Sequence, residues 1–600
     1  PSPPPPSPSP RPPSPSLLSP SPPPSPPSPS PQPPPPPRSP SPPPPPSPPP
    51  ATTPDHLVPT AWASYETGNI SLPRLDEFTA ALTDVLSGGG RVVLSSGGAA
   101  GGVVSEGQGY GLLLAGAAAA ALPAGHPRRD EVVALALEYF RGWEATCMGT
   151  IANSCQDTYL CGANGEFKCL PSWKFNNDVS SEVGTGSASD GDEDAILGML
   201  LLVLATKMEQ PAWWDEVARW TYQSCRAFLE HNTEQHASKV AFNGQPQRML
   251  KLGSCWGGWD CSNPSYHAPG HYRAFRDFML RYAADYGVAA TEGTEYAPKW
   301  DSLIETSLAL LSDSQCADTG LVPNWYVPND GTTGCSGSGT PAAEFGSEAS
   351  RTMWRVALDA LWYADSAAVH FNDRASVQVA TKLAQYGVNG CYSPSSCEAL
   401  RLDTGCLVTS IHADWIWNAF MLGPASTALT VPLSAAYGGT SADEARQQLA
   451  LDNAAGVLSQ QSITGYYGGS WIAIATITLT GDLPRLAPLV AALAGPAPPS
   501  PPSPPPQPKP PPSPSLPPSP SPPPGPTPCT SACDSCSAVP GNAAWATDDH
   551  CAPCATGQAW WPCDVKPNPC KCDAKPAPSP SPTPSPSPSP PSSSLLPSPP

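Results

Sequence analysis

The sequence contains few basic residues. Its 30 Lys and Arg stand against 50 Asp and Glu, which gives a net charge of −20 over 600 residues. Proteins that bind nucleic acid need clustered Lys and Arg to neutralise phosphates, so this composition argues against a nucleic-acid partner. No apolar run of about 18 residues occurs, so we expect no membrane-spanning segment. Histidine is scarce, with 9 residues, and none is placed at the spacing of a zinc site beside the cysteines between residues 54 and 494. We therefore expect no metal and no other cofactor.

Proline, in contrast, is abundant. Most of the 89 prolines lie in three Ser-Pro segments, residues 1–53, 495–528 and 573–600. Proline fixes φ and lacks a backbone donor, so we expect these segments to be disordered, extended polyproline-type stalks. Their serine content also suggests O-glycosylation. Two segments remain that can fold, residues 54–494 and residues 529–572.

The short segment 529–572 holds eight of the 20 cysteines. An even, dense set of this kind indicates a disulfide framework in an oxidising compartment, and roughly 44 residues need such staples because their core is too small. The alternative is zinc, which two Cys-x2-Cys spacings would suit. We expect a protein that is secreted to the cell exterior or cell wall, and a start at Pro1 without Met is compatible with a removed targeting segment.

The other twelve cysteines lie between residues 54 and 494. We predict that Cys225 is a buried free thiol on a helix. The rest stand in loop-like stretches, which predicts loop disulfides among Cys147, Cys155, Cys161, Cys169, Cys255, Cys261, Cys316, Cys335, Cys391, Cys397 and Cys406.

Residues 54–494 show helical periodicity throughout. Apolar residues recur at spacings of three and four from Leu75 to Val85 and from Val132 to Phe140, and about ten further runs follow. This pattern predicts an all-α domain of about twelve helices. An α-solenoid would give a similar pattern, although no fixed-period repeat is visible.

Two acidic stretches, residues 105–111 (SEGQGYG) and 187–196 (SASDGDEDAI), stand out in this domain. Each places carboxylates among small residues beside an apolar helical run. A single stretch of this kind is more simply a solvated loop or a helix start. Cleavage of a glycosidic bond, however, needs one protonated and one ionised carboxyl group. The two stretches together indicate a sugar-cleaving enzyme.

These stretches resemble the two signature segments of glycoside hydrolase family 8, and the resemblance extends over roughly residues 55–490. Further matching segments follow in the family's order, namely Trp173-Lys174, Asn263–Tyr266, Gly320–Trp325, Arg351–Arg355 and Tyr466–Trp471. The resemblance implies an (α/α)6 barrel of six helical hairpins. We expect loops at one end of that barrel to supply the catalytic residues.

Glu106 matches the family's proton donor. We expect the Leu run that adjoins Tyr110 to provide apolar surroundings, which would raise the pKa of this carboxyl. We also expect Gly107, Gly109 and Gly111 to allow close approach of the sugar.

Asp190 matches the family aspartate that binds and distorts the sugar at the cleavage point. We interpret Asp192, Glu193 and Asp194, which follow it, mainly as charges that favour a helix N-terminus.

The carboxylate that would act as the catalytic base is harder to identify, because its motif departs from the family's. The family's commonest pattern is Tyr-Asp-Ala-x-Arg, whereas this chain has Ser-Glu-Ala-Ser-Arg, so the aligned carboxylate is Glu348. We predict Glu348 as the base, because an inverting site separates its carboxyls by about 6.5–9.5 Å and tolerates a longer side chain. Asp318 and Glu344 are alternatives. A further alternative is that Glu348 only pairs with Arg351 at i,i+3.

We expect sugar rings to stack on Trp173 and Tyr266, and Arg351 either to bind a sugar hydroxyl or to hold the base. Other aromatics of the matching segments are more often part of a core. In the short segment, residues 554–563 resemble the cysteine-rich carbohydrate-binding modules of volvocine green algal cellulases. Trp560 and Trp561 would be its glycan-stacking residues.

The sequence therefore predicts a secreted, monomeric, inverting endo-β-1,4-glucanase whose polysaccharide substrate is a cell-wall or extracellular-matrix β-glucan. A Pro-rich tether would join it to a glycan-binding module. One alternative keeps the fold and acts on chitosan, xylan or mixed-linkage β-glucan. Another is a non-catalytic wall glycoprotein that only binds glycan.

Overall fold

The computed structural model describes residues 72–95, 101–147, 160–162, 167–241, 245–317, 319–328, 330–337, 340–386, 406–412, 419–434, 441–495, 559–560 and 572–573. The chain divides into two units after Ser500. In the second unit the description covers only strands β12 (Ala559–Trp560) and β13 (Cys572–Asp573), which pair antiparallel. Apart from these strands and Gly495, the predictions for 1–53, 495–528, 529–572 and 573–600 concern residues outside the described part.

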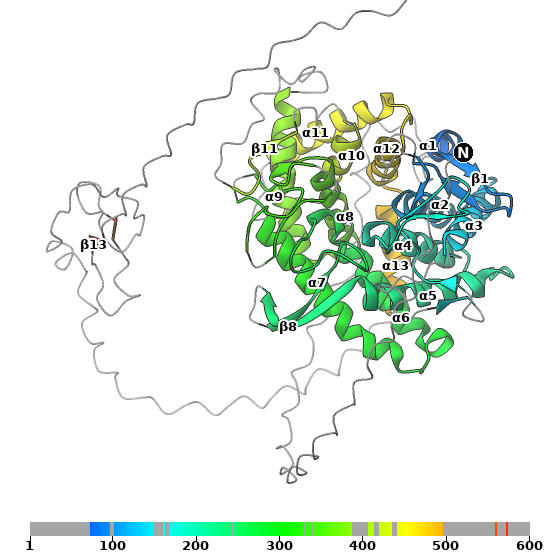
Figure 1. Ribbon diagram of the computed structural model, residues 1–600. Coiled ribbons are helices and arrows are strands. Elements are labelled where there is room, and N and C mark those ends of the chain that lie inside the picture. The colour runs from blue at the N-terminus through cyan, green and yellow to red at the C-terminus, as the bar shows by residue number, and fades with distance from the viewer. Residues whose placement is uncertain are drawn as a thin grey trace, which may run out of the picture. The chain divides into compact units, whose positions relative to one another are not determined.

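Six helices of the first unit form a closed inner ring (Figure 1). Each contacts the next in the series, and α12 contacts α2. The inner helices are α2 (Ser105–Ala121), α4 (Ser189–Ala205), α6 (Pro269–Tyr286), α8 (Ser347–Tyr363), α10 (Ala419–Thr427) and α12 (Tyr466–Leu479).

Six further helices pack outside this ring, each against at least one inner helix. They are α1 (Leu72–Leu82), α3 (Arg129–Thr146), α5 (Trp214–His231), α7 (Glu292–Ser314), α9 (Ser366–Tyr386) and α11 (Ser441–Gln460). A short thirteenth helix, α13 (Ala487–Ala491), packs against α8. Inner and outer helices alternate along the chain, which confirms the predicted (α/α)6 barrel.

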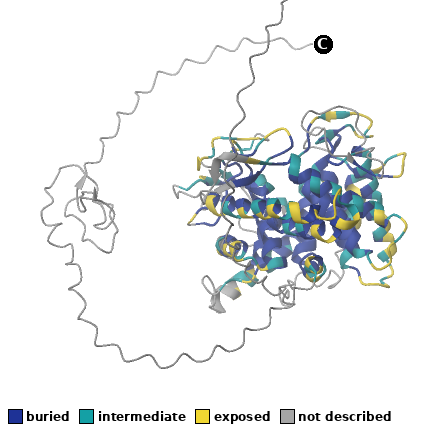
Figure 2. Cartoon of the chain, turned by 90° about the horizontal axis from the view of Figure 1, so that it is seen from below, coloured by how far each residue is buried: buried dark blue, intermediate teal, exposed yellow. Residues whose placement is uncertain are grey.

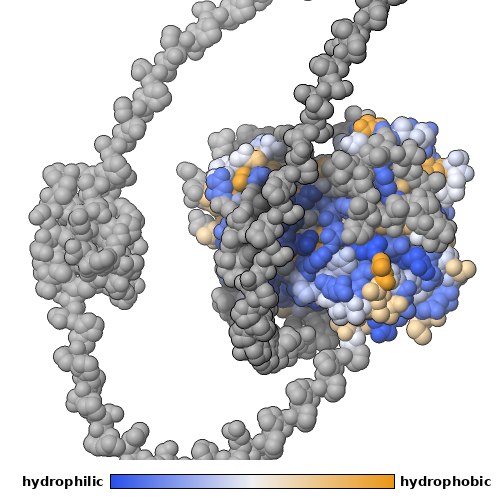
Figure 3. Space-filling view, turned by 60° about the horizontal axis from the view of Figure 1, so that its bottom comes forward, coloured by the Kyte–Doolittle hydropathy of each residue, from blue (hydrophilic) through white to orange (hydrophobic). Residues whose placement is uncertain are grey.

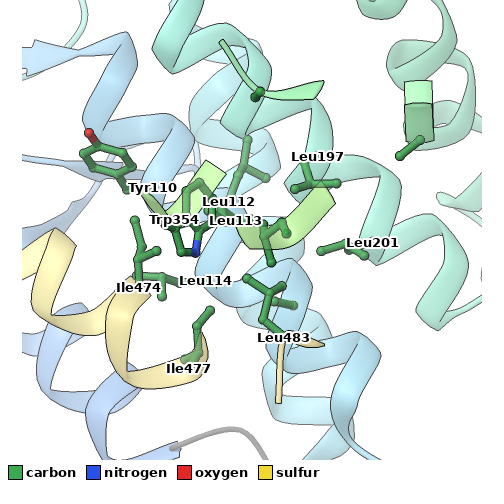
Figure 4. Close-up of a cluster of buried hydrophobic side chains, with 14 of the residues drawn as sticks. Tyr110, Leu112, Leu113, Leu114, Leu197, Leu201, Trp354, Ile474, Ile477 and Leu483 are labelled. Atoms are coloured by element: carbon green, nitrogen blue, oxygen red, sulfur yellow. The ribbon is translucent and has the colours of Figure 1, made fainter. Parts of the chain in front are cut away.

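The core lies where the inner helices meet. Figure 4 shows side chains of four inner helices converging, and those it labels include Leu113 of α2, Leu197 of α4, Trp354 of α8 and Ile474 of α12. Helices α2 and α4 are buried on nearly every side because the ring and the outer helices surround them. Figure 2 shows the exposed residues mainly at the margin of the barrel.

Glycines allow α2 and α4 to cross at short distance. A Cβ atom on Gly109 would lie 2.5 Å from the carbonyl oxygen of Gly191, and one on Gly116 would lie 2.2 Å from that of Gly198. No larger residue fits at these positions without moving a helix. The crossing brings together the first turns of both helices, which carry the two acidic stretches.

Strands connect the helices at the barrel ends. Strands β3, β6 and β7 form a three-stranded sheet, and β10 pairs in parallel with β11. The strands of the first unit are β1 (Thr83–Val85), β2 (Arg91–Val93), β3 (Val103–Val104), β4 (Leu160–Cys161), β5 (Phe167–Lys168), β6 (Lys174–Phe175), β7 (Glu182–Gly184), β8 (Thr233–Ala241), β9 (Gln245–Leu250), β10 (Glu344–Phe345) and β11 (Ser410–Ile411). The 3-10 helices are η3 (Pro264–Tyr266), η5 (Ala428–Thr430), η6 (Pro484–Leu486) and η7 (Ala492–Ala494).

One predicted helix is shorter than its periodicity indicated. The run from Leu75 to Val85 was expected to be helical throughout, but α1 ends at Leu82 and the last three residues form β1. There they pair antiparallel with β2, with Val85 opposite Arg91. Pairing with a neighbouring strand therefore overrides the local helical pattern.

Three loop disulfides confirm the prediction for their cysteines: Cys161–Cys169, Cys261–Cys335 and Cys316–Cys406. Cys225 is a buried free thiol on α5, also as predicted. The prediction for Cys147 is wrong, because this residue caps the C-terminus of α3 as a buried free thiol. Cys155, Cys391 and Cys397 lie outside the described residues.

The described surface is mostly hydrophilic, as one face shows in Figure 3. Large exposed apolar side chains include Val183, Met208, Trp256 and Val288. Within the described residues, no single helix has the length and apolar character to cross a membrane; only the bent pair of Tyr466–Leu479 and Pro484–Ala494 meets both criteria together.

Candidate active site

The three predicted catalytic carboxylates begin three inner helices. Glu106 is the second residue of α2, Asp190 of α4 and Glu348 of α8, and each follows a serine. Inner helices run in the same direction because outer helices alternate with them, so their first turns lie at one end of the barrel. The prediction that loops supply these residues is wrong. The helix dipole favours a carboxylate in this first turn.

A single guanidinium group binds all three carboxylates. Nη1 of Arg351 lies 2.6 Å from Oε1 of Glu106 and 3.0 Å from Oδ2 of Asp190, and Nη2 donates to Oε2 of Glu348. Arg351 is itself buried. The pairing of Glu348 with Arg351 at i,i+3 is therefore present, but as part of a larger cluster. This cluster joins helices α2, α4 and α8.

Two tyrosine hydroxyls also bind Glu106. Tyr110 donates to Oε1 over 2.7 Å, and Tyr466 of α12 donates to Oε2. Burial raises the pKa of Glu106 to about 7, and the negative charge of Asp190 acts in the same direction. Arg351 and the two hydroxyls lower it, but by less. The direction and the main cause agree with the expectation from the sequence.

The glycines around Glu106 do not serve the purpose we predicted. A Cβ on Gly107 would lie 2.6 Å from Cε2 of Tyr466, and one on Gly111 would lie 2.6 Å from Cε1 of Tyr139. Gly109 faces α4. The missing side chains therefore make room for protein atoms rather than for a sugar, and that prediction is wrong.

An asparagine orients the candidate base. Nδ2 of Asn263 donates to Oε2 of Glu348 over 2.8 Å. Of the alternatives, Glu344 lies in β10 with its carboxyl near Ser410 and His412, and burial raises its pKa. Asp318 lies outside the described residues. Glu348 is thus the candidate that shares a partner with Glu106.

A second asparagine fixes the start of the helix that carries Glu348. Oδ1 of Asn324 accepts hydrogen bonds from the backbone N–H groups of Gly346 (3.1 Å) and Ala349 (2.9 Å). Helix caps usually come from the adjacent residue, and Gly346 has no side chain to serve. The sequence reasoning missed this remote cap, because only the tertiary fold brings Asn324 to α8.

The acidic residues that follow Asp190 are more than helix-terminal charges. They lie in the first turns of α4, as expected from the sequence, but all three are fully buried. Asp194 makes two hydrogen bonds with Arg355, at 2.9 and 3.0 Å. Glu193 lies 2.7 Å from the same guanidinium, and Asp192 accepts from Asn232 over 2.7 Å. These residues anchor α4 to its neighbours beneath the cluster.

Their protonation differs with their partners. Burial raises the pKa of Asp192 and of Glu193 well above the usual range. Burial also opposes ionisation of Asp194, but Arg355 and His271 outweigh it and lower the pKa. Arg351 and Arg355 stand one turn apart on α8, so a second ion pair lies directly below the first.

Aromatic rings surround the cluster. The Tyr266 ring lies 5.2 Å from the guanidinium carbon of Arg351, and the Tyr467 ring lies 5.8 Å from it. The backbone oxygen of Trp173 accepts from Ser105 N–H, next to Glu106, over 3.0 Å. Trp256, which sequence reasoning missed, is 37% exposed.

The two tryptophans lie over glycines of one segment. A Cβ on Gly184 would lie 2.3 Å from Cε2 of Trp173, and one on Gly186 would lie 2.6 Å from Cζ3 of Trp256. This segment leads directly into α4 and Asp190. Both rings therefore flank the chain that enters the cluster.

Two other tryptophans do not line the site. Trp143 and Trp325 are buried and belong to the core. Trp560 lies in β12, but its side chain, like the whole of Trp561, is outside the described residues. The glycan-binding role of Trp560 and Trp561 stays a prediction.

Parts of this chain are similar to known proteins. Residues 163–404 match the model of the glycosyl hydrolases family 8. Endoglucanase A of Acetivibrio thermocellus is 27% identical over 330 residues, which are 54% of this chain and 56% of the relative. Endoglucanase 2 of Ruminiclostridium josui is 28% identical over 201 residues, 32% of this chain and 35% of the relative.

Among solved structures, the β-1,3-1,4-glucanase from Paenibacillus sp. X4 superposes with a TM-score of 0.49 at 16% identity, covering 73% of this chain and 96% of that one. The chain spans about half the length of the first curated relative and about a third of the second. The family match includes Asp190, Glu348 and Arg351 and begins after Glu106. Together, the family match and the endoglucanase relatives support a family 8 glycoside hydrolase domain in this chain.

Proposed function

We propose that this protein is a secreted, inverting endo-β-1,4-glucanase. The observation that carries the proposal is the binding of Glu106, Asp190 and Glu348 to one guanidinium, with the pKa of Glu106 raised to about 7. The raised pKa suits Glu106 to the role of the acid, and acid–base hydrolysis requires a second carboxyl nearby as the base, a place that Glu348 fills. The names of the curated relatives support a β-glucan as the substrate.

In the proposed reaction, Glu106 donates its proton to the glycosidic oxygen as the bond from the anomeric carbon to that oxygen breaks. Glu348 accepts a proton from a water molecule, and the oxygen of that water bonds to the anomeric carbon from the opposite face. The products are two free sugar ends, a protonated Glu348 and an ionised Glu106. The configuration at the anomeric carbon inverts.

Asp190 would hold the sugar at the cleavage point. Its Oδ1 accepts the N–H of Gly191 over 2.9 Å and its Oδ2 accepts from Arg351, so the carboxylate has a fixed orientation. A rigid acceptor of this kind suits a sugar hydroxyl whose hydrogen bond strengthens as the ring distorts. Trp173, Tyr266 and Trp256 would supply stacking surfaces for neighbouring rings.

The first test is hydrolysis, followed by release of reducing ends from carboxymethyl cellulose, chitosan, xylan and lichenan. We expect the highest kcat/KM on carboxymethyl cellulose. The change Glu106→Gln should lower kcat by about 100-fold or more while leaving substrate binding largely intact, because a general acid acts mainly in the transition state. A matched control is Glu305→Gln, since Glu305 is exposed on outer helix α7.

If Glu106→Gln keeps a tenth or more of kcat, Glu106 is not the acid. A highest rate on chitosan would change the substrate and keep the chemistry, and the net charge of −20 is the observation that favours this cationic glycan. Binding without any release of reducing ends would support a glycan-binding wall protein instead.

The second test is stereochemical. An inverting enzyme releases the α-anomer as the first product from a β-glucan. Proton NMR during early turnover, before mutarotation, should show the α-anomer accumulating. Early accumulation of the β-anomer would mean a retaining reaction and would exclude Glu348 as a base acting on water.

A further inference from the structure

Asn263 is held in place from both sides. It is fully buried at the start of η3. Two residues before it, Cys261 forms a disulfide with Cys335. The adjacent Ser262 exchanges two backbone hydrogen bonds with Tyr326, at 2.8 and 2.9 Å. The backbone from which the Asn263 side chain extends is therefore tied to the segment 326–335.

The hydrogen bonds also decide which way the amide points. Oδ1 of Asn263 accepts from the backbone N–H of Ser265 over 2.9 Å and from its hydroxyl over 2.8 Å. A backbone N–H only donates, so the amide atom that faces it must be the carbonyl oxygen. The NH2 group consequently faces Glu348, where it lies 2.8 Å from Oε2.

Two groups that can only donate thus meet at one oxygen of Glu348. Besides the Asn263 amide, Nη2 of Arg351 also donates to Oε2. Neither group accepts a hydrogen bond, so a proton on Oε2 would face two N–H hydrogens. Donors of this kind stabilise the ionised carboxylate.

Glu106 has one oxygen whose partner is of another kind. Arg351 donates to its Oε1, as it does to Glu348, but Oε2 of Glu106 binds the hydroxyl of Tyr466. A hydroxyl can donate or accept, so it accommodates either the ionised or the protonated acid. The two carboxyls therefore differ in the chemistry of their partners, and the difference matches the roles of base and acid.

The other ionisable groups near Glu348 do not provide this distinction. They are Arg351 on α8, Tyr266 in η3 and Tyr467 on α12, with Glu106 and Asp190 beyond the guanidinium. The charge of Arg351 is divided among three carboxylates. The amide of Asn263, by contrast, is directed at Glu348.

We propose that Asn263 is a positioning residue that fixes the orientation of Glu348 and keeps this carboxylate ionised as the base. The inference rests on the proposed function, in which Glu348 activates water. It assigns a task to a side chain that does not itself need to touch the sugar.

The test is the pH profile of kcat/KM for Asn263→Ala on the polysaccharide that the wild type hydrolyses. Removing the donor should move the acidic limb of the profile toward neutral pH by about one unit, since one strong donor to the ionised form is lost. Activity on that limb should fall about tenfold at a given pH. The alkaline limb, which reports the protonation of Glu106, should stay in place.

A matched control is Asn232→Ala. Asn232 is another fully buried asparagine, and its Nδ2 donates to Oδ2 of Asp192 over 2.7 Å, outside the Arg351 cluster. Both changes should lower the melting temperature, but only Asn263→Ala should move the acidic limb. Should Asn263→Ala fail to fold, Asn263→Ser serves for the same measurement.

Glu348→Gln, measured in parallel, tests whether Glu348 is the base separately from whether Asn263 positions it. If it keeps a tenth or more of kcat, Glu348 is not the base, and the role of Asn263 is wrong with it. If it is inactive but the Asn263 variant loses activity by the same factor at every pH, the base assignment stands. In that case Asn263 only supports the fold, and the inference is overturned.

Discussion

At the scale of single residues, Glu106 is governed by opposing effects. Three donors, from Arg351, Tyr110 and Tyr466, would each favour its ionised form. Burial nevertheless outweighs them, with help from Asp190, and raises the pKa from 4.5 to about 7. The donors set the direction in which the carboxyl points, whereas burial decides its charge. A positioned acid that is still protonated near neutral pH is the result.

This shift has a consequence for stability. In the unfolded chain Glu106 ionises near 4.5, and in the folded protein near 7. Between these values the folded state binds more protons, so this group's contribution to stability falls as pH rises through that window. Glu106→Gln lacks the dependence. Its melting temperature, relative to wild type, should therefore rise from pH 4.5 to 7 and then level off.

Thermal unfolding of both proteins in the same buffers measures this difference and cancels the titration of the shared groups that do not interact with Glu106. A difference in melting temperature between the two proteins that stays constant from pH 4.5 to 7 would contradict the raised pKa of Glu106.

The sequence indicated the candidate catalytic carboxylates but not most of their partners. Glu106, Asp190 and Glu348 lie in recognisable motifs, and Arg351 follows Glu348 within one helical turn. Tyr466 binds Glu106 from 360 positions along the chain, and Asn263 binds Glu348 from 85. No local pattern reports a contact of that kind, because the fold alone creates it.

At the scale of helices, the crossing of α2 and α4 sets the spacing of the site. A Cβ added at Gly191 would lie 2.5 Å from the backbone nitrogen of Glu106. That contact involves backbone on both sides, so neither helix can yield by turning a side chain. The position of Glu106 relative to Asp190 therefore depends on the absence of one methyl group.

Gly191→Ala should for this reason destabilise the protein by about 1–3 kcal/mol, as overpacking does, and should lower kcat. The matched control is Gly456→Ala on outer helix α11, where an added Cβ meets no atom within 4 Å. There alanine should stabilise by about 0.5–1 kcal/mol, the usual difference within a helix. Denaturant unfolding and kcat measure both variants; equal effects at the two sites would refute the tight crossing.

Helix existence was easier to predict than helix limits. The barrel contains the predicted number of about twelve helices, but the helical run that was expected to reach Val85 ends at Leu82 in α1. Helix α7 contains Pro298. A proline usually ends a helix because it lacks the N–H and clashes with the preceding turn. Packing of α7 against α6 stabilises this helix despite the proline.

At the scale of the whole molecule, closure of the ring depends on contacts between distant parts of the sequence. Helix α12 must pack against α2, and α1 packs against both. Periodicity shows that helices exist but not that the last one returns to the first, so the barrel was predictable only through the family resemblance. The glycan-binding module, likewise, is expected from a short motif and from composition.

We propose that residues 529–572 bind glycan and that the Pro-rich segment 495–528 tethers them to the barrel. Such a tether raises the local concentration of substrate without a new catalytic contact. In the full chain, replacing Trp560 and Trp561 together with alanine should strongly reduce retention on insoluble cellulose and leave only the binding by the barrel. A pull-down with the wild type as reference measures this.

The chemistry of stacking adds conditions to that test. Contact between an aromatic face and a sugar is largely apolar, so retention of the wild type should change little with salt. A chelator should leave retention intact, and a reductant should remove it, because eight cysteines in so short a segment are expected to form disulfides. If the chelator abolishes retention and the reductant does not, the cysteines bind zinc, and the argument for an oxidising compartment rests on the barrel disulfides alone.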